Sequence, residues 1–289
     1  MTEHQNKQDS EDERVARQTI QSDRLLDITM LLPTLEGPGW RANLRKKINT
    51  LLSVPRLHQI FQEAEHEENP FATILKGLDI TPDLADLRER IPETGACIVV
   101  ANHPNGGSDA LTLLSQCIGR RRDTLALANS LLMGLPGVGK WLIPLNIMGQ
   151  EAATQRNQLA MKAALGHLSR GGVLLVFPAG TLSHWRGDMG RVADPEWSNH
   201  IARLAKKAMV PVLPVRIFEK NPAWFTVLGA LHLNVRSALV PRLLISSSGK
   251  SLICRAGRII EPSELEACSN AREATGVIRH AVQVVKQPE

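Results

Sequence analysis

The sequence predicts an α/β fold, in which a largely parallel, mixed sheet is flanked by helices and preceded by an N-terminal helical segment. Short apolar runs at 96–101, 173–177 and 210–217 are typical of buried strands. Amphipathic segments with helical spacing separate these runs. Because strands that alternate with helices form parallel sheets covered by helices, we expect one layered α/β domain.

The composition fits a globular protein and leaves its partners open. The chain has 289 residues, with 34 Lys and Arg against 29 Asp and Glu, and a net charge of +5. This charge favours acidic partners such as anionic lipid, a phosphopantetheine-bearing carrier protein or coenzyme A, but ordinary surface charge explains it equally well. The four cysteines are far apart and lack a C-x-x-C pair, which argues against a disulfide framework or zinc site and fits a reducing cytosol.

The N-terminal residues 1–22 are polar, and we expect them to form a flexible tail. They lack the apolar core of a signal peptide. The sequence also has no run of about 18 apolar residues free of charges, Pro and Gly. If the protein acts on lipid, we therefore expect it to lie on the membrane rather than to span it.

Residues 23–78 are expected to form a helical segment. From residue 40 onward, Leu44, Ile48 and Leu51 share one helical face and basic residues lie largely on the other. Pro55 marks the start of a second helix. A basic amphipathic pair of this kind is compatible with a membrane interface and with packing on the main domain, and both interpretations stay open.

Residues 79–289 contain the alternating elements of the main domain. Strands are expected at 96–101, 124–128, 173–177, 210–217 and 251–260. Helices are expected at 110–118, where Gly119 follows, and at 151–169, 196–208 and 263–286.

The segment 101–109 follows the first predicted strand and precedes a helix, a position where α/β proteins commonly place reactive groups. His103 is suited to take a proton from an alcohol, and Asp109 is suited to orient the imidazole and stabilise its charged form. The glycines at 106 and 107 let the loop turn back and expose backbone N–H groups at a helix start. A helix cap joined to a simple turn explains the same residues, and this segment alone does not choose between the two interpretations.

A second segment adds weight to the catalytic interpretation. Phe177, Pro178, Ala179, Gly180 and Thr181 follow the strand at 173–177, again at a carboxyl end. Together with N-H at 102–103, Asp109 and the V-P-V-L-P-V run at 210–215, this order resembles the glycerolipid acyltransferase superfamily. The resemblance covers about residues 78–260.

Two departures from the superfamily pattern narrow the resemblance. The interval from His103 to Asp109 is one residue longer than usual, and Ala179 stands where many members have glutamate. The chain has the form H-P-x-G-G-x-D, followed by F-P-A-G and a Ser-His-Trp segment at 183–185. This combination is similar to a bacterial subgroup labelled hemolysins. That subgroup in turn resembles acyltransferases that complete ornithine lipids. The missing glutamate counts against glycerol 3-phosphate recognition more than against acyl transfer.

The resemblance implies roles for the loop residues. His103 would be the general base on the acceptor hydroxyl, and Asp109 its orienting partner. Asn102, Gly106 and Gly107 would shape the loop, with backbone N–H groups as candidate oxyanion donors.

The remaining candidate residues concern the acceptor. Phe177 and Pro178 belong to the block that would bind substrate, and Gly180 and Thr181 would hold the acceptor head group. Asn146 falls in a segment that corresponds to a further acceptor-binding block, although the family's usual arginine is absent there.

The resemblance also implies partners and location. Residues 79–289 would be an acyltransferase domain. Its co-substrate would be acyl coenzyme A or an acyl-carrier protein, and its acceptor would be a lyso-lipid. No metal, redox cofactor or nucleic acid is implied. The enzyme would be cytoplasmic and peripheral on the inner face of the cell membrane. A non-catalytic lipid-binding protein on the same scaffold and a hydrolase are the alternatives, and the absence of a G-x-S-x-G motif counts against a serine hydrolase.

Three further signals carry little weight. The segment 134–140 fits the start of a P-loop, but Trp141 stands where Ser or Thr is needed, so we interpret it as a turn. The arginines at 120–122 suit a phosphate group or, equally, a helix carboxyl end. The apolar stretch 222–231 fits a lipid contact or an ordinary core helix.

Overall fold

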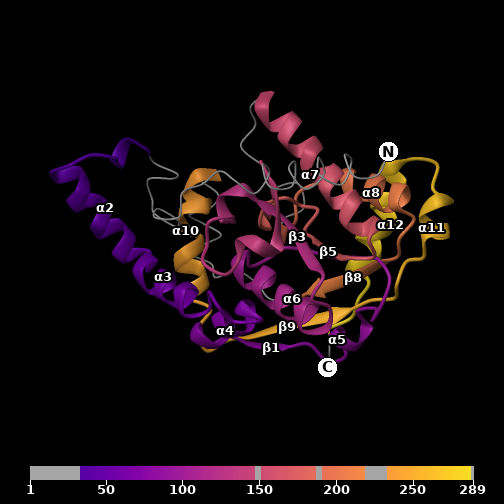
Figure 1. The fold of residues 1–289 in the computed structure, drawn as a ribbon, viewed down its shortest axis with the longest axis horizontal. Helices are drawn as coiled ribbons and strands as arrows, with labels where there is room; N and C mark the ends of the chain where they lie inside the picture. Colours follow the sequence, from indigo (N-terminus) through magenta and orange to yellow (C-terminus); the bar gives the residue numbers. More distant parts are fainter. Residues whose placement is uncertain (1–32, 147–150, 187–190, 219–232, 288–289) are drawn as a thin grey trace, which may run out of the picture.

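The computed structural model describes residues 33–146, 151–186, 191–218 and 233–287 (Figure 1). Its centre is a seven-stranded sheet with the strand order β1-β9-β8-β2-β5-β3-β4. The strands are β1 (Thr81–Asp83), β2 (Cys97–Ala101), β3 (Thr124–Asn129), β4 (Leu142–Leu145), β5 (Val173–Val176), β8 (Val212–Ile217) and β9 (Ser251–Ala256). Neighbours from β8 to β4 are parallel, whereas β9 runs antiparallel to β8 and parallel to β1. The predicted largely parallel, mixed sheet is therefore confirmed.

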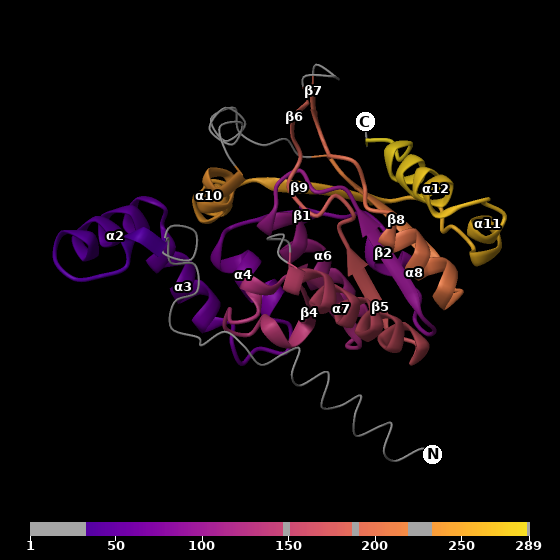
Figure 2. The same ribbon diagram turned by 90° about the horizontal axis from the view of Figure 1, so that it is seen from above.

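Helices cover both faces of this sheet. One face carries α4 (Pro70–Gly77), α5 (Leu87–Arg90) and α6 (Gly107–Arg120). The other carries α7 (Glu151–Ser169), α8 (His200–Ala208), α11 (Pro262–Glu266) and α12 (Ala271–Gln283). Figure 2 shows α7, α8 and α12 gathered on one side of the sheet.

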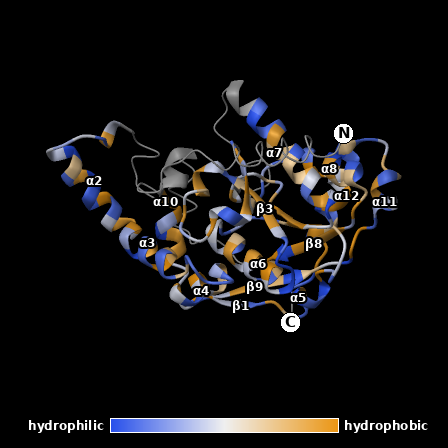
Figure 3. Ribbon diagram, in the orientation of Figure 1, coloured by the Kyte–Doolittle hydropathy of each residue, from blue (hydrophilic) through white to orange (hydrophobic). Residues whose placement is uncertain are grey.

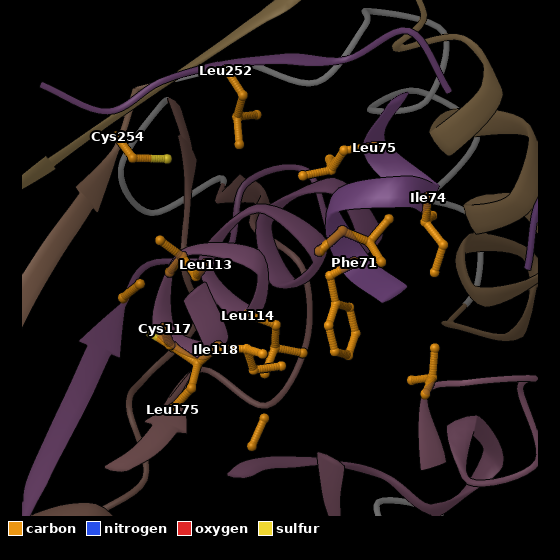
Figure 4. Close-up of a cluster of buried hydrophobic side chains, with 14 of the residues drawn as sticks. Phe71, Ile74, Leu75, Leu113, Leu114, Cys117, Ile118, Leu175, Leu252 and Cys254 are labelled. Carbon is orange, nitrogen blue, oxygen red and sulfur yellow. The ribbon is translucent and has the colours of Figure 1, made fainter. Parts of the chain in front are cut away.

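The central strand β2 explains why both faces are covered. All five of its residues are buried, and successive side chains alternate between the two cores. Figure 4 shows the first core, where α4 and α6 meet the side chains of β5 and β9. Full burial of an aliphatic side chain stabilises a fold by about 1.5–3 kcal/mol. A strand that contributes to two cores therefore fixes the middle of the sheet, and with it the loop that follows Ala101.

The N-terminal helices extend to one side of the molecule in both views (Figures 1 and 2). They are the short η3 (Pro33–Leu35), α2 (Trp40–Leu51) and α3 (Val54–Glu63). Helix α3 buries Leu57 and Phe61 in the first core, so this helix packs on the main domain. Helix α2 buries none of its residues. Packing on the main domain is therefore shown for α3, whereas α2 keeps exposed apolar side chains.

Several predicted boundaries differ from the structure. The helix expected at 110–118 begins at Gly107 and continues to Arg120, and the helix expected at 196–208 begins at His200. The single closing helix expected at 263–286 is wrong, because α11 ends at Glu266 and α12 begins at Ala271. A local polar network separates the two, since the Asn270 side chain accepts the Glu273 N–H and the Glu273 carboxylate accepts from Ser269.

Several of the described elements were not predicted, among them the short helix α5 (Leu87–Arg90). Others are the short strands β1 and β4, helix α10 (Leu233–Ile245), and a hairpin made of β6 (His184–Arg186) and β7 (Arg191–Ala193). The strands have only three or four residues, too few to show a period of two. The apolar stretch at 222–231 lies outside the described residues.

Candidate active site

The two sequence blocks meet at one edge of the sheet. The histidine loop follows β2, and the loop that begins at Phe177 follows β5. These strands are adjacent and parallel, with Val100 opposite Val176 in the register. Because parallel strands end at the same edge, the two loops lie side by side where α/β folds commonly bind ligands.

His103 and Asp109 form a hydrogen-bonded pair. The His103 Nδ1 atom lies 3.1 Å from Asp109 Oδ2. The Asp109 side chain is fully buried, whereas the His103 side chain keeps 15% of its surface exposed. Because a carboxylate can only accept hydrogen bonds, Nδ1 is the donor in this contact, and Nε2 is the ring nitrogen left for another partner. Within the described part of the chain, no group hydrogen-bonds to His103 Nε2.

The loop between the two residues wraps around the carboxylate. Asp109 Oδ2 accepts the backbone N–H groups of Asn105 at 2.7 Å and Gly106 at 3.1 Å, and Oδ1 accepts the Asn105 side-chain amide at 3.1 Å. Gly106 has a φ of 66° immediately before α6, a conformation that favours glycine. The longer interval between His103 and Asp109 therefore fits into a closed turn, and Asp109 acts as both helix cap and histidine partner.

Phe177 holds the other side of the imidazole. Its ring is stacked on the His103 ring, with 4.2 Å between centroids and 29° between planes. The sequence placed Phe177 in a substrate-binding block; in the structure its ring packs against His103. Together Phe177 and Asp109 restrict how the imidazole can rotate.

Asn102 joins neighbouring strands. Its side-chain amide donates to the Ile217 carbonyl at 2.9 Å, and its side-chain oxygen accepts the Ile217 N–H at 2.8 Å. Since Ile217 ends β8, this residue extends the pairing of β2 and β8 beyond the last strand residue. Asn102 thus shapes the start of the histidine loop.

The other predicted residues lie around the pair. Gly107 is the first residue of α6, and the Pro178 carbonyl accepts the Ser198 N–H at 3.0 Å. Gly180, with a φ of 64°, is exposed, and Thr181 is half-buried. Gly180 and Thr181 therefore form the part of the Phe177 loop that is open to a ligand.

Asn146 lies at the same edge but farther along the sheet. It follows β4, which is separated from β2 by β5 and β3. Its backbone N–H and carbonyl bond to the Asn157 side chain at 2.8 and 2.9 Å, which joins the end of β4 to α7. With a strand spacing of about 4.8 Å, Asn146 lies roughly 14 Å from the end of β2. The structure therefore does not bring Asn146 into contact with the pair.

Three residues that the sequence did not single out as functional lie behind the histidine: Ser183, Asp194 and Trp197. Asp194 Oδ1 accepts the His103 N–H at 3.3 Å and the Ser183 hydroxyl, and Oδ2 accepts the Trp197 indole N–H at 2.9 Å. The Ser183 N–H in turn donates to the His103 carbonyl at 2.9 Å. Asp194 belongs to no recognisable motif, and 91 positions separate it from His103, so no local sequence signal marks it.

A family model for acyltransferases matches residues 57–288. The chain belongs to this acyltransferase family. The match spans most of the chain, from α3 to the C-terminal end, and the protein is accordingly an acyltransferase enzyme. The resemblance of its sequence blocks to the glycerolipid acyltransferase superfamily is thus confirmed.

The acyltransferase is also similar to individual characterised proteins. A lyso-glycine lipid O-acyltransferase from Phocaeicola vulgatus is 26% identical over 221 residues, 74% of this chain and 76% of that protein. A lyso-glycine lipid O-acyltransferase from Bacteroides thetaiotaomicron is 30% identical over 139 residues, 47% of this chain and 48% of that protein. The crystal structure of the 1-acyl-sn-glycerophosphate (LPA) acyltransferase PlsC from Thermotoga maritima aligns over 98% of this chain and 95% of that one, with a TM-score of 0.45 and 19% identity.

The arginine run of the acyltransferase lies at the edge of the sheet opposite to His103. Arg120 pairs with Glu93, Arg121 with Asp123, and Arg122 with Glu68. Each guanidinium thus already has a carboxylate partner, which favours a structural role over a phosphate site. As for membrane crossing, a search of the described residues finds no helix with the length and hydropathy of a membrane span.

Proposed function

We propose that this acyltransferase moves a fatty acyl group from a thioester donor onto the hydroxyl of a lyso-lipid, with His103 as general base and Asp109 as its orienting partner. The observation that carries the proposal is the 3.1 Å contact between His103 Nδ1 and Asp109 Oδ2. It leaves the partly exposed imidazole with Nε2 available for an acceptor hydroxyl. Burial of Asp109 keeps water from competing for this contact.

The proposed reaction needs no covalent acyl-enzyme. His103 Nε2 takes the proton of the acceptor hydroxyl while the oxygen attacks the thioester carbonyl carbon. The new C–O bond forms, the C–S bond breaks, and the imidazolium returns its proton to the leaving thiolate. Asp109 stabilises the imidazolium during this exchange.

The oxyanion of the tetrahedral intermediate needs nearby donors. The Gly106 N–H is already bonded to Asp109, which leaves Gly107 at the first position of α6 as the better candidate among the predicted glycines. Backbone N–H groups in the first turn of a helix lack intrahelical partners and face the positive end of the helix dipole. The start of α6 is thus suited to a developing negative charge.

The proposed acceptor is a lyso-aminolipid in preference to lysophosphatidic acid. The two curated relatives above are named for a lyso-glycine lipid. Ala179 also stands where many members of the superfamily have a glutamate, and its absence counts against glycerol 3-phosphate recognition. Gly180 and Thr181 at the loop tip would receive the head group, and Asn146 would contribute only to a large acceptor that reaches along the edge.

The proposed donor is acyl coenzyme A or an acyl-carrier protein, and the proposed location is the cytoplasmic face of the cell membrane. Helix α2 supports the location. Trp40, Leu44 and Leu51 are exposed along one helical stripe, while the helix carries four basic residues and no acidic one. Figure 3 shows hydrophilic and hydrophobic residues alternating along α2. An apolar stripe bordered by cations is the pattern of a helix that lies in an anionic membrane interface.

The test is a free-thiol assay on the purified full-length protein. Acyl coenzyme A and acyl-carrier-protein donors are each combined with lyso-aminolipid or lysophosphatidic acid. We expect thiol release that depends on the lyso-aminolipid. His103→Ala should abolish it, and Asp109→Asn should lower kcat by about 10⁴-fold because the imidazole loses its correct tautomer. His280→Ala, which changes an exposed histidine on α12, is the matched control and should keep full activity.

Each other outcome selects a different interpretation. Full turnover by His103→Ala would exclude the mechanism. Thiol release without any acceptor would indicate a hydrolase, and acceptor dependence on lysophosphatidic acid alone would replace the proposed acceptor. Binding of lyso-lipid without thiol release would indicate a non-catalytic lipid-binding protein.

A further inference from the structure

We infer that Asp194 is a positioning residue that holds the main chain of His103 in place for catalysis. This inference rests on the proposed role of His103 as general base. Asp109 and Phe177 determine how the imidazole is turned, but neither holds the Cα atom from which the ring projects. That constraint comes from the opposite side of the loop.

The main chain of His103 is bonded at both of its polar groups. Its N–H donates to Asp194 Oδ1 at 3.3 Å, and its carbonyl accepts the Ser183 N–H at 2.9 Å. Asp194 Oδ1 also accepts the Ser183 hydroxyl, so Asp194 supports both contacts. The peptide groups on either side of the catalytic histidine are therefore held by one small network.

The network is buried and joins three segments. Asp194, Ser183 and Trp197 expose 8%, 6% and 4% of their surfaces. Through Asp194, the histidine loop is linked to the loop after β5 and to the segment before α8. Hydrogen bonds to a buried carboxylate are shielded from competing water, so they favour one arrangement of this junction.

The hairpin of β6 and β7 is attached at the same point. Ser183 directly precedes β6 and Asp194 directly follows β7, so the base of the hairpin lies against the histidine loop. Figure 2 shows β6 and β7 extending away from the main sheet. Asp194 therefore couples the hairpin base to the position of His103.

Loss of the Asp194 carboxylate should displace the histidine without removing it. A shift of about 1 Å in a catalytic group can cost on the order of 100-fold in rate. We expect Asp194→Ala to lower kcat by roughly that factor while the KM for the acceptor changes by less than about threefold, because Asp194 acts through His103 and not on the acceptor.

Asp194→Asn gives a sharper test. Its amide oxygen can still accept from His103 and Ser183, but its NH₂ group would face the Trp197 indole N–H, and two donors repel each other. We expect a kcat about 10-fold below wild type, on the scale of one or two displaced hydrogen bonds. The double variant Asp194→Asn/Trp197→Phe removes the opposing donor, and its kcat should rise back toward the wild-type value.

The experiment measures kcat and KM for these variants in the free-thiol assay, with circular dichroism to quantify folded protein. Asp123→Asn is the matched control, because it removes a hydrogen-bonded carboxylate at the opposite edge of the sheet. Its kcat per folded molecule should equal that of wild type.

The outcomes separate this inference from the proposed function. If His103→Ala is inactive while Asp194→Asn keeps the wild-type kcat, the positioning role is wrong and the proposed function stands. If His103→Ala is fully active, the proposed role of His103 as general base fails first. The inference is also overturned if the variants raise only the KM, or if the kcat of Asp194→Asn is no lower than that of the Asp123→Asn control. The comparison of these two asparagine variants can be made even if Asp194→Ala does not fold.

Discussion

Single residues in the histidine loop have more than one structural task. Asp109 accepts from His103, Asn105 and Gly106, so one carboxylate closes the loop, caps α6 and orients the imidazole. The sequence presented helix capping and catalysis as competing explanations of Asp109. The structure shows that the geometry of the cap is what brings the carboxylate to the histidine, so the two tasks are compatible.

Gly106 and Gly180 allow a prediction about backbone conformation at this scale. Both have a positive φ, near 65°, but a Cβ on Gly106 would lie 2.7 Å from Leu182 Cδ2, whereas a Cβ on Gly180 would meet nothing within 4 Å. Left-handed backbone costs a non-glycine residue about 1–2 kcal/mol, and steric overlap adds about 1–3 kcal/mol. Gly106→Ala should therefore lower the free energy of unfolding by clearly more than Gly180→Ala, as measured by urea denaturation. Equal losses would show that Leu182 moves aside freely.

At the scale of whole elements, α2 and α3 show that similar sequence patterns can have different partners. Both helices are amphipathic, yet α3 buries Leu57, Ile60 and Phe61 in the first core and α2 buries nothing. Near its start α2 is held by a hydrogen bond from Arg41 to the Glu36 carbonyl, and near its end Ile48 packs against a small cluster together with Leu239 of α10. The free stripe of α2 is thus the part of the N-terminal segment available to a membrane.

The α2 stripe predicts binding to anionic vesicles. Leu51→Glu should weaken co-sedimentation with vesicles of phosphatidylglycerol and phosphatidylcholine by at least about tenfold, because one buried leucine contributes about 1.5–3 kcal/mol. Higher salt should weaken the wild-type interaction further, since the basic residues of α2 lose their attraction. The control is Leu159→Glu, which changes another exposed leucine, on α7, and should bind like wild type. Unchanged binding by Leu51→Glu would exclude α2 as the membrane contact.

At the scale of the whole molecule, the two edges of the sheet have different roles. The C-terminal edge of the parallel strands holds His103, and the N-terminal edge is closed by Arg121. All five N–H groups of Arg121 are bonded, two to the Asp123 carboxylate and three to the carbonyls of Pro92, Gly95 and Gly171. These carbonyls precede β2 and β5, and Asp123 precedes β3. One guanidinium therefore ties together the starts of three central strands.

Arg121 is expected to be a large contributor to stability. Arg121→Ala should lower the free energy of unfolding by about 2–4 kcal/mol, because it removes a buried guanidinium that makes five hydrogen bonds and leaves three partly buried carbonyls without this donor. Arg121→Lys should recover little of this loss, since an ammonium group cannot match the five donors. Arg122→Ala, which removes an exposed ion pair next to it, should change stability by about 0.5 kcal/mol or less. Chemical denaturation of the three variants at neutral pH checks the order.

The same contact predicts a pH dependence. The hydrogen bond from Arg121 holds the pKa of the Asp123 carboxyl below its ordinary value of 3.8. A lowered carboxyl pKa adds stability that is complete above the ordinary value and is lost as pH falls through the lower folded value. The difference in unfolding free energy between wild type and Arg121→Ala should therefore be constant above about pH 5 and narrow below about pH 4. A constant difference down to acid pH would contradict a role for the charged pair.

The sequence by itself determined the class of the fold and the two loops of the site. Alternating apolar runs and amphipathic helices are local patterns, and parallel strands end at one edge, so His103 and Phe177 could be placed at the same edge before any contact was known. Only the tertiary structure decided that Asp194 holds His103 from 91 positions away, that Arg121 closes the opposite edge, and that α3 is buried while α2 is not. Periodicity reports which face of an element is apolar, but the order of strands in the sheet determines which distant residues meet that face.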